Sequence, residues 1–144
     1  MTTTPRQTVE AFLTGFRHRD VDAAVTTVSD DVQVTVYPLQ IADSGPDVIR
    51  AVLVDIGAAF PDLHLTVKHV TELGAVVVVE MKIEGTQAAD YRGILNQEKH
   101  LAVDSAWRFT IGADQQIVAI DVYWCQNQLL RRLAVKRTDQ TAIV

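Results

Sequence analysis

The side chains of this chain that could transfer protons lie close to aromatic residues. Asp121 precedes Trp124 by three positions, and a carboxylate beside aromatic side chains has a raised pKa that suits proton transfer near neutral pH. His69 could relay a proton through its neutral imidazole. The phenols of Tyr37 and Tyr91 could donate a hydrogen bond to an enolate or an epoxide oxygen, or could lie half-buried at a pocket rim without such a role. Asp121, His69, Tyr37 and Tyr91 are the predicted catalytic residues.

Alternation along the last predicted strand, residues 116–124, gives Asp121 two alternative environments. One register is wholly apolar and contains Val118, Ile120, Val122 and Trp124. The other register is amphipathic and contains Ile117, Ala119, Asp121 and Tyr123. An enclosed pocket fits the apolar register, which would leave Asp121 on the outer face of the sheet. A β-bulge close to Asp121 would return its carboxylate to the pocket, because a one-residue offset reverses the face of a strand.

The same parity places two further polar residues on inward faces. His69 is in register with Leu65 and Val67, so its side chain should point inward, either into a pocket or as a hydrogen-bonded core residue. Gln87 continues the inward register of Met81 on another strand. Its amide can orient a carbonyl group, but it cannot exchange protons at neutral pH.

Aromatic and apolar side chains on the predicted inward faces could contact a planar molecule. Trp107, Trp124 and Phe60 could stack on it, although the same rings could serve as core packing without any ligand. The predicted substrate-binding residues are Trp107, Trp124, Gln87, Val122, Ile120, Phe60 and Met81. The expected partner is an apolar small molecule.

The composition fits a single domain over residues 1–144, with its core at 6–134 and a tail at 135–144. The chain is 48% hydrophobic and 22% charged, which suffices to bury a core. A formal net charge of −5 and a pI near 5.2 argue against nucleic acid or an anionic membrane as a partner. The longest apolar run, Ala75 to Val79, is too short to span a bilayer, and no signal peptide precedes it, so we expect a cytoplasmic protein.

Neither a metal nor a nucleotide is indicated as a cofactor. The sequence contains one cysteine, which excludes an intrachain disulfide. It contains no glycine-rich phosphate loop and no histidine–carboxylate spacing typical of metal sites. Any chemistry is expected to be cofactor-independent.

The periodicity predicts helices mainly in the first part of the chain and strands in the second. Helices are expected from Pro5 through Phe16 and over 21–28, 46–60 and 126–133. Strands are expected over 32–37, 63–73, 75–86, 91–95, 100–111 and 116–124. This order indicates an α+β domain in which helices cover one face of a strongly curved antiparallel sheet.

The order and spacing of several segments resemble the SnoaL-like polyketide cyclases of the nuclear transport factor 2-like superfamily. The segments are Ala59 to Leu63, Gly85 to Ile94, Phe109 to Asp114 and Ile117 to Trp124, followed by Leu129-Leu130. The resemblance covers residues 6–134. It implies a cone-shaped sheet covered by N-terminal helices, a cystatin-like roll, with a small-molecule pocket inside the cone. Proteins of this fold commonly dimerise through the outer sheet face, so we expect a homodimer.

The resemblance also implies catalytic residues that this sequence replaces. SnoaL-like cyclases use an aspartate on the last strand for an intramolecular aldol closure, often with a histidine on the preceding strand. An ungapped alignment places Val122 at that aspartate and Trp107 at that histidine. The nearest carboxylate, Asp121, lies one residue away.

Three functions remain open at this point. The first is a cofactor-independent cyclase or isomerase that acts by acid–base catalysis on an apolar polyketide-type molecule of secondary metabolism. The second is an epoxide hydrolase, because relatives with that activity use two aspartates bridged by an arginine. Asp104, Arg108 and Asp121 could supply this set, or could form cross-strand ion pairs on the outer face. The third is a binding protein without chemistry, which the replacements at Val122 and Trp107 favour.

Overall fold

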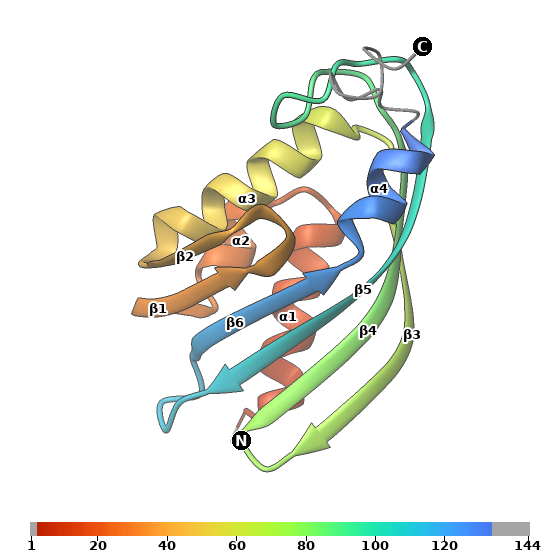
Figure 1. Ribbon diagram of the computed structural model, residues 1–144. Helices are drawn as coiled ribbons and strands as arrows, with labels where there is room; N and C mark the ends of the chain where they lie inside the picture. The colour runs from red at the N-terminus through yellow and green to blue at the C-terminus, as the bar shows by residue number, and fades with distance from the viewer. Residues whose placement is uncertain (1–2, 134–144) are drawn as a thin grey trace.

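The computed structural model describes residues 3–133 of the chain, which form a six-stranded sheet with helices (Figure 1). The helices are α1 (Pro5–Arg17), α2 (Val21–Val25), α3 (Pro46–Ala59) and α4 (Gln126–Arg132), with a 3-10 turn, η1 (Tyr37–Leu39). The strands are β1 (Val28–Val36), β2 (Ile41–Ser44), β3 (His64–Leu73), β4 (Val76–Thr86), β5 (His100–Ile111) and β6 (Ile117–Trp124). The predicted tail, residues 135–144, lies outside the described residues.

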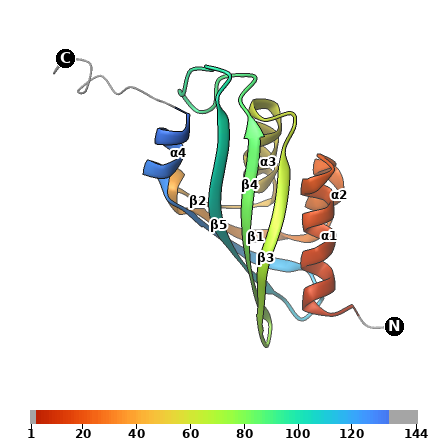
Figure 2. The same cartoon turned by 90° about the vertical axis from the view of Figure 1, so that its right-hand side faces the viewer.

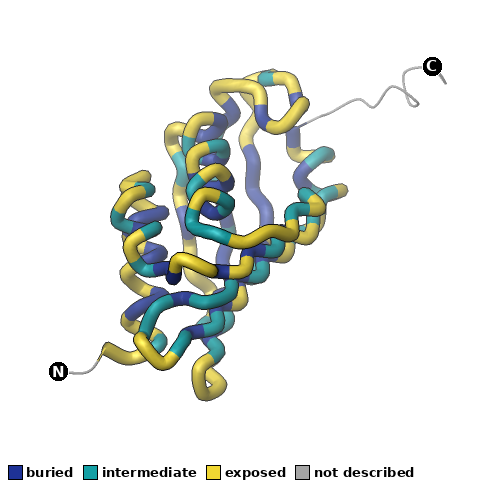
Figure 3. Tube along the Cα trace, turned by 90° about the vertical axis from the view of Figure 1, so that its left-hand side faces the viewer, coloured by how far each residue is buried: buried dark blue, intermediate teal, exposed yellow. Residues whose placement is uncertain are grey.

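The sheet is curved, and helices α1 to α3 cover one of its faces (Figure 2). We call this the inner face and define it by Val79, Trp107 and Val122, which pair across three neighbouring strands and are fully buried. The opposite, outer face carries Arg108 and Asp121, which pair with each other across β5 and β6. Buried positions follow the inward sides of the strands and helices (Figure 3). The α+β fold predicted from periodicity is therefore confirmed.

The sheet order, β2-β1-β6-β5-β4-β3, contains one pairing that differs from the expected antiparallel pattern. β1 and β6 are parallel, whereas the other neighbouring strands are antiparallel. Parallel neighbours need a long connection, and the segment from β2 to β5 supplies it here. This arrangement places β6, the last strand, between β1 and β5 in the middle of the sheet.

Two short segments also differ from the sequence-based expectations. The predicted strand over 91–95 is wrong, because Arg92 and Gly93 adopt positive φ angles of 45° and 83°. Tyr91 and Ile94 instead pair with each other across this turn. The short strand β2 was not predicted, because four residues are too few to display a clear alternation.

Helix α1 begins with a capping box and covers the centre of β5. Thr4 Oγ1 accepts a hydrogen bond from Gln7 N at 3.1 Å, and Thr4 N donates to Gln7 Oε1 at 2.9 Å. The rings of Phe12 and Phe16 lie 6.3 and 5.4 Å from that of Trp107, measured between centroids. This aromatic packing fills the narrow part of the interior and leaves the opposite end, near α4, for a cavity.

Two helical glycines should respond in opposite directions to the same substitution. A Cβ at Gly15 in α1 would lie 2.6 Å from the backbone N of Ala24, whereas a Cβ at Gly57 in α3 would meet Arg19 Cδ at 3.7 Å. We expect Gly15→Ala to lower the free energy of unfolding by about 1–3 kcal/mol, because α1 and α2 must separate. The control Gly57→Ala should raise it by about 0.5–1 kcal/mol. Urea unfolding measures both, and equal effects would contradict the close approach of α1 and α2.

Candidate functional site

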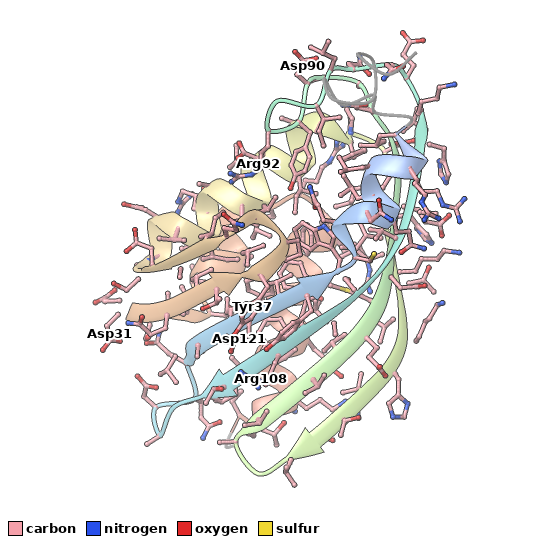
Figure 4. The ribbon with its side chains drawn as sticks, viewed as in Figure 1. Asp31, Tyr37, Asp90, Arg92, Arg108 and Asp121 are labelled. Carbon is pink, nitrogen blue, oxygen red and sulfur yellow. The ribbon has the colours of Figure 1, made fainter. Side chains whose placement is uncertain are left out.

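A polar cluster on the outer face contains two of the predicted catalytic residues, Asp121 and Tyr37. Asp121 Oδ2 lies 3.1 Å from Arg108 Nη2, and the hydrogen-bonded ion pair raises the pKa of the Arg108 guanidinium. Tyr37 stacks on Tyr123 with ring centroids 4.6 Å apart, and hydrogen bonding with Tyr37 raises the pKa of Tyr123. Figure 4 shows Asp121 and Arg108 on the neighbouring strands β6 and β5, with Tyr37 of η1 close to them. None of these groups lies on the inner face.

The outward position of Asp121 follows from the place of the bulge in β6. The register of β6 against β5 shifts between Ile117 and Ala119, which leaves Val118 as the extra residue. Because this bulge precedes Asp121 on a strand that is regular afterwards, it does not turn the carboxylate inward. Val122 is fully buried, as the apolar register predicts, whereas Ile117 is buried in place of Val118.

His69 also lies on the outer face, so its predicted inward orientation is wrong. The pairing of β3 with β4 shifts between Val67, which pairs with Met81, and His69, which pairs with Glu80. The extra residue, Lys68, reverses the alternation that would otherwise group His69 with Val67. His69 is exposed to solvent as a result.

The three residues considered for epoxide opening do not assemble. Asp121 pairs with Arg108, but Asp104 Oδ1 lies 3.1 Å from Lys68 Nζ, and those two side chains are 63% and 53% exposed. Such an exposed ion pair contributes about 0–1 kcal/mol and leaves both groups in water. The geometry therefore favours ordinary cross-strand ion pairs over a water-activating site.

An apolar cavity lies on the other side of the sheet, between its inner face, α3 and α4. We call it the inner cavity; its lining residues are Ile56, Phe60, Ile83, Tyr91, Leu101, Val103, Trp124 and Leu129. The inner cavity has a volume of about 20 Å³. This is room for roughly one water molecule. Figure 1 shows α3 and α4 at the end of β4 and β5 where the loop of residues 87–99 connects these strands.

Local hydrogen bonds position α3 and α4 around the inner cavity. Asp62 Oδ1, just after α3, accepts a hydrogen bond from Thr86 N at 2.7 Å, which ties the end of α3 to β4 and lowers the pKa of Asp62. Trp124 ends β6, and its Nε1 donates to Gln126 Oε1 at 2.9 Å. Because this indole N–H is already bonded, the Trp124 ring offers the cavity an apolar surface.

Tyr91 carries the only hydroxyl group among the described residues that line the inner cavity. The residue is 3% exposed, and burial raises the pKa of its phenol, with Arg92 partly opposing the effect. Arg92 Nη2 in turn lies 3.0 Å from Asp55 Oδ2 on α3. The phenol is therefore protonated at neutral pH, so that it can donate a hydrogen bond but cannot serve as a base.

The 87–99 loop is held together by internal hydrogen bonds and is joined to α3 by a backbone hydrogen bond and by the Arg92–Asp55 ion pair. Gln87, 1% exposed, donates from Nε2 to Ile94 O at 3.1 Å. Ala88 N donates to Ala59 O, at the end of α3, over 2.8 Å. Farther along the loop, Asp90 Oδ1 accepts a hydrogen bond from Asn96 N at 2.8 Å. Figure 4 shows Asp90 and Arg92 on this loop, far from Asp121 and Arg108.

The structure brings some of the predicted substrate-binding residues to the inner cavity and leaves others in the core. Phe60 and Trp124 line the cavity, as does Tyr91, which was predicted to be catalytic. The predicted substrate-binding residues that are buried elsewhere are Trp107, Ile120, Val122, Met81 and Gln87. Trp107 packs against α1, and its Nε1 donates to Ser105 Oγ at 3.1 Å, so its ring is a core element.

The remaining lining residues were missed by the sequence analysis. They are Ile56, Ile83, Leu101, Val103 and Leu129. Ile83 and Val103 pair directly across β4 and β5, so strand parity could have placed both on the inner face. Parity does not tell which inward residues border a cavity, because that depends on where α4 and the 87–99 loop pack.

A larger hollow of about 580 Å³ lies on the outer face, but it is an open groove. Its lining residues are Lys68, Glu80, Met81, Asp104, Ser105, Ala106, Tyr123, Trp124 and Cys125. The Lys68–Asp104 ion pair in it is solvent-exposed. An open groove excludes little water and encloses little of a ligand's surface. The inner cavity is therefore the better candidate site despite its small volume.

The described residues provide neither a metal cluster nor a membrane span. No group of three or more histidine, cysteine, aspartate or glutamate side chains within residues 3–133 could hold a metal ion. None of the helices in that range has the length and apolar composition that crossing a bilayer requires. The inner cavity offers an apolar lining to which Tyr91 contributes its ring, while the Tyr91 hydroxyl hydrogen-bonds with Arg92.

Comparison with known proteins identifies a family and a fold. A family model described as a SnoaL-like domain matches residues 9–120. The comparison with curated proteins gives no match. A proposed SnoaL-like polyketide cyclase from Jannaschia sp. CCS1 is 21% identical with a TM-score of 0.79, over 95% of this chain and 99% of that one.

Two further solved structures share the fold. IdmH, a proposed polyketide cyclase from Streptomyces antibioticus, is 16% identical with a TM-score of 0.78, over 92% of this chain and 100% of that one. A protein with a ketosteroid isomerase-like fold from Catenulispora acidiphila, in complex with trimethylamine, is 18% identical with a TM-score of 0.75, over 93% and 96% of the two chains. At such identities these likenesses show the fold alone.

The burial of Tyr91 predicts a loss of stability in alkaline solution. Its pKa lies above the value of about 10 that tyrosine has in an unfolded chain. The stabilisation is therefore complete below about pH 10 and is lost as the pH rises through the folded pKa. We expect the free energy of unfolding to fall more steeply above that pH in the wild type than in Tyr91→Phe, as measured by urea titrations at several pH values. Equal slopes would contradict the burial of the phenol.

Proposed function

Because the chain belongs to the SnoaL-like family, we propose that it binds an apolar, polyketide-type small molecule in the inner cavity. The lining carries this proposal, since its described residues include no carboxylate, imidazole, ammonium or guanidinium group. Burying apolar ligand surface there is favourable by about 25 cal/mol per Å². A charged ligand would be buried without a partner. The relatives described as polyketide cyclases support this ligand class.

Binding of a molecule of that size requires the inner cavity to expand. Its volume of about 20 Å³ is far below the roughly 300–1,000 Å³ of ordinary ligand pockets. Leu129 lies on the seven-residue helix α4, and Tyr91 lies on the 87–99 loop. Both can move without breaking a strand pairing of the sheet. We propose that the ligand enters between α4 and this loop.

Filling the inner cavity tests the binding function. Val103 lines the cavity from β5, whereas Val78 on the neighbouring strand β4 pairs with Arg108 on the outer face. Val103→Ile adds one methyl group to the lining and should weaken binding of the neutral fluorescent probe N-phenyl-1-naphthylamine several-fold, on the order of 1 kcal/mol. The matched control Val78→Ile should leave the affinity unchanged. Affinity that falls equally in both variants, or in neither, would contradict binding in the inner cavity.

A second candidate function is ring closure or isomerisation of the bound molecule without a cofactor. Tyr91 favours it, because its buried, neutral phenol would stabilise negative charge that develops on an enolate oxygen if the side chain turns toward the ligand as the cavity expands. The cavity would hold the substrate in a folded conformation and exclude water. Asp121 has no part in this proposal, since its carboxylate pairs with Arg108 on the outer face.

Product formation from a linear poly-β-ketone, followed by mass spectrometry, tests this second function. Tyr91→Phe should lower the rate about 10–1,000-fold, as removal of an oxyanion-stabilising donor does. Asp121→Asn should leave the rate within about twofold, because its carboxylate pairs with Arg108 on the opposite side of the sheet from the cavity. Loss of turnover in Asp121→Asn would overturn the assignment. Probe binding without product in the wild type would restrict the function to binding.

We also propose a homodimer that forms through the outer face. Tyr37 and Tyr123 are 50% and 37% exposed and stack on each other, which provides a rigid aromatic surface. Arg108 and Asp121 beside them offer both signs of charge, as a self-complementary two-fold interface requires. This surface lies across the sheet from the inner cavity, so association would leave the lining residues in place.

A further inference from the structure

The side-chain amide of Gln87 is buried, and its oxygen has no hydrogen-bond partner among the described residues. The residue is 1% exposed, and its Nε2 donates to Ile94 O at 3.1 Å. Buried acceptors are nearly always paired, because leaving one unpaired costs the free energy of its lost hydration. A free acceptor in this position therefore needs a physical reason.

The orientation of the Gln87 amide follows from its neighbours. Because the carbonyl oxygen of Ile94 can only accept, the nitrogen of Gln87 must be the atom that faces it. Ile94 O also accepts a hydrogen bond from Tyr91 N at 2.9 Å, which uses its second lone pair. The free atom of Gln87 is thus the oxygen, an acceptor. The expectation that this amide orients a carbonyl group stays a prediction, because Nε2 has a second hydrogen besides the one that Ile94 O accepts.

Gln87 does not line the inner cavity, but it lies next to residues that do. Gln87 follows Gly85 in the inner register of β4, and Gly85 pairs with Leu101, which lines the cavity. The amide meets the turn that carries Tyr91, another lining residue. The 87–99 loop is also one of the two elements that must move to admit a ligand. A shift of this loop on ligand entry would therefore bring the free oxygen, which is buried behind the lining, to the bound molecule.

We propose that Gln87 Oε1 accepts a hydrogen bond from a hydroxyl group of the bound molecule and so selects an apolar ligand that carries a phenol or an alcohol. This inference rests on the proposed binding function, because it places the ligand in the inner cavity. A ketone or ether oxygen cannot replace the hydroxyl group, since it has no proton to donate. An ammonium group could donate, but it would bring an unpaired charge into an apolar enclosure. Nε2 continues to hold Ile94, so selection does not require the loop to lose this anchor.

Three aromatic probes of similar size separate the contribution of the Gln87 hydrogen bond from that of apolar burial. Phenol can donate a hydrogen bond, anisole can only accept one, and toluene does neither. Affinities of the full chain are measured by NMR titration, and each is expressed relative to toluene so that the apolar contribution is compared within one protein. We expect Gln87→Met, which is nearly isosteric, to reduce the phenol-to-toluene affinity ratio about tenfold. The anisole-to-toluene ratio should stay unchanged.

A control separates hydrogen bonding from a loosened loop, since Gln87→Met also removes the bond to Ile94. Arg92→Ala releases the loop from Asp55 while leaving Gln87 intact, and it should retain the wild-type phenol-to-toluene ratio. A second test uses only the wild-type protein, so it does not depend on whether a variant folds. Phenol should shift the side-chain amide resonances of Gln87 more than toluene does.

The outcomes distinguish this inference from the proposed function. If all three probes bind and the phenol-to-toluene ratio is the same in the wild type and in Gln87→Met, the role of Gln87 is overturned while binding in the cavity stands. A ratio that falls equally in Arg92→Ala also overturns it, because the loop would then be responsible. If no probe binds to the wild type, the proposed function fails and the role of Gln87 fails with it.

Discussion

The pairing of β6 between β1 and β5 determines which of its side chains reach the interior. Because β6 is paired along both edges, a shift by one residue would disrupt two ladders and turn its buried side chains to solvent. The observed register buries Ile120 and Val122 completely and leaves Asp121 outside, paired with Arg108. The bulge at Val118 precedes these residues and does not alter their faces. The apolar character of the interior depends on this register.

An apolar interior restricts the chemistry that the inner cavity can support. Charged groups are costly to bury without partners, and the buried polar side chains of the adjoining loop are neutral, a phenol at Tyr91 and an amide at Gln87. Both belong to the 87–99 loop, and neither lies on β6. Recognition and any rate enhancement would then come from enclosure, orientation and hydrogen bonding, and the fully buried Val122 offers no proton to exchange.

Periodicity predicted most of the fold because the long elements bury side chains at regular intervals. A strand buries every second side chain, and a helix buries one about every three to four residues. The same parity placed Trp107 correctly on the inner face. It failed at His69, because the extra residue Lys68 reverses the strand without leaving a mark in the polarity pattern. It could not identify Leu129 as a lining residue, since that role depends on how α4 packs over the sheet. The unpaired oxygen of Gln87 likewise follows from the loop conformation.

Methyl NMR during titration with N-phenyl-1-naphthylamine is the most direct test of binding in the inner cavity. Resonances of Ile83, Val103 and Leu129, which line the cavity, should shift with a common saturation curve. The methyl resonances of Val78, which pairs with Arg108 on the outer face, should not shift. Shifts confined to Val78 and the surrounding outer face, with the cavity methyl groups unaffected, would contradict binding inside the cone.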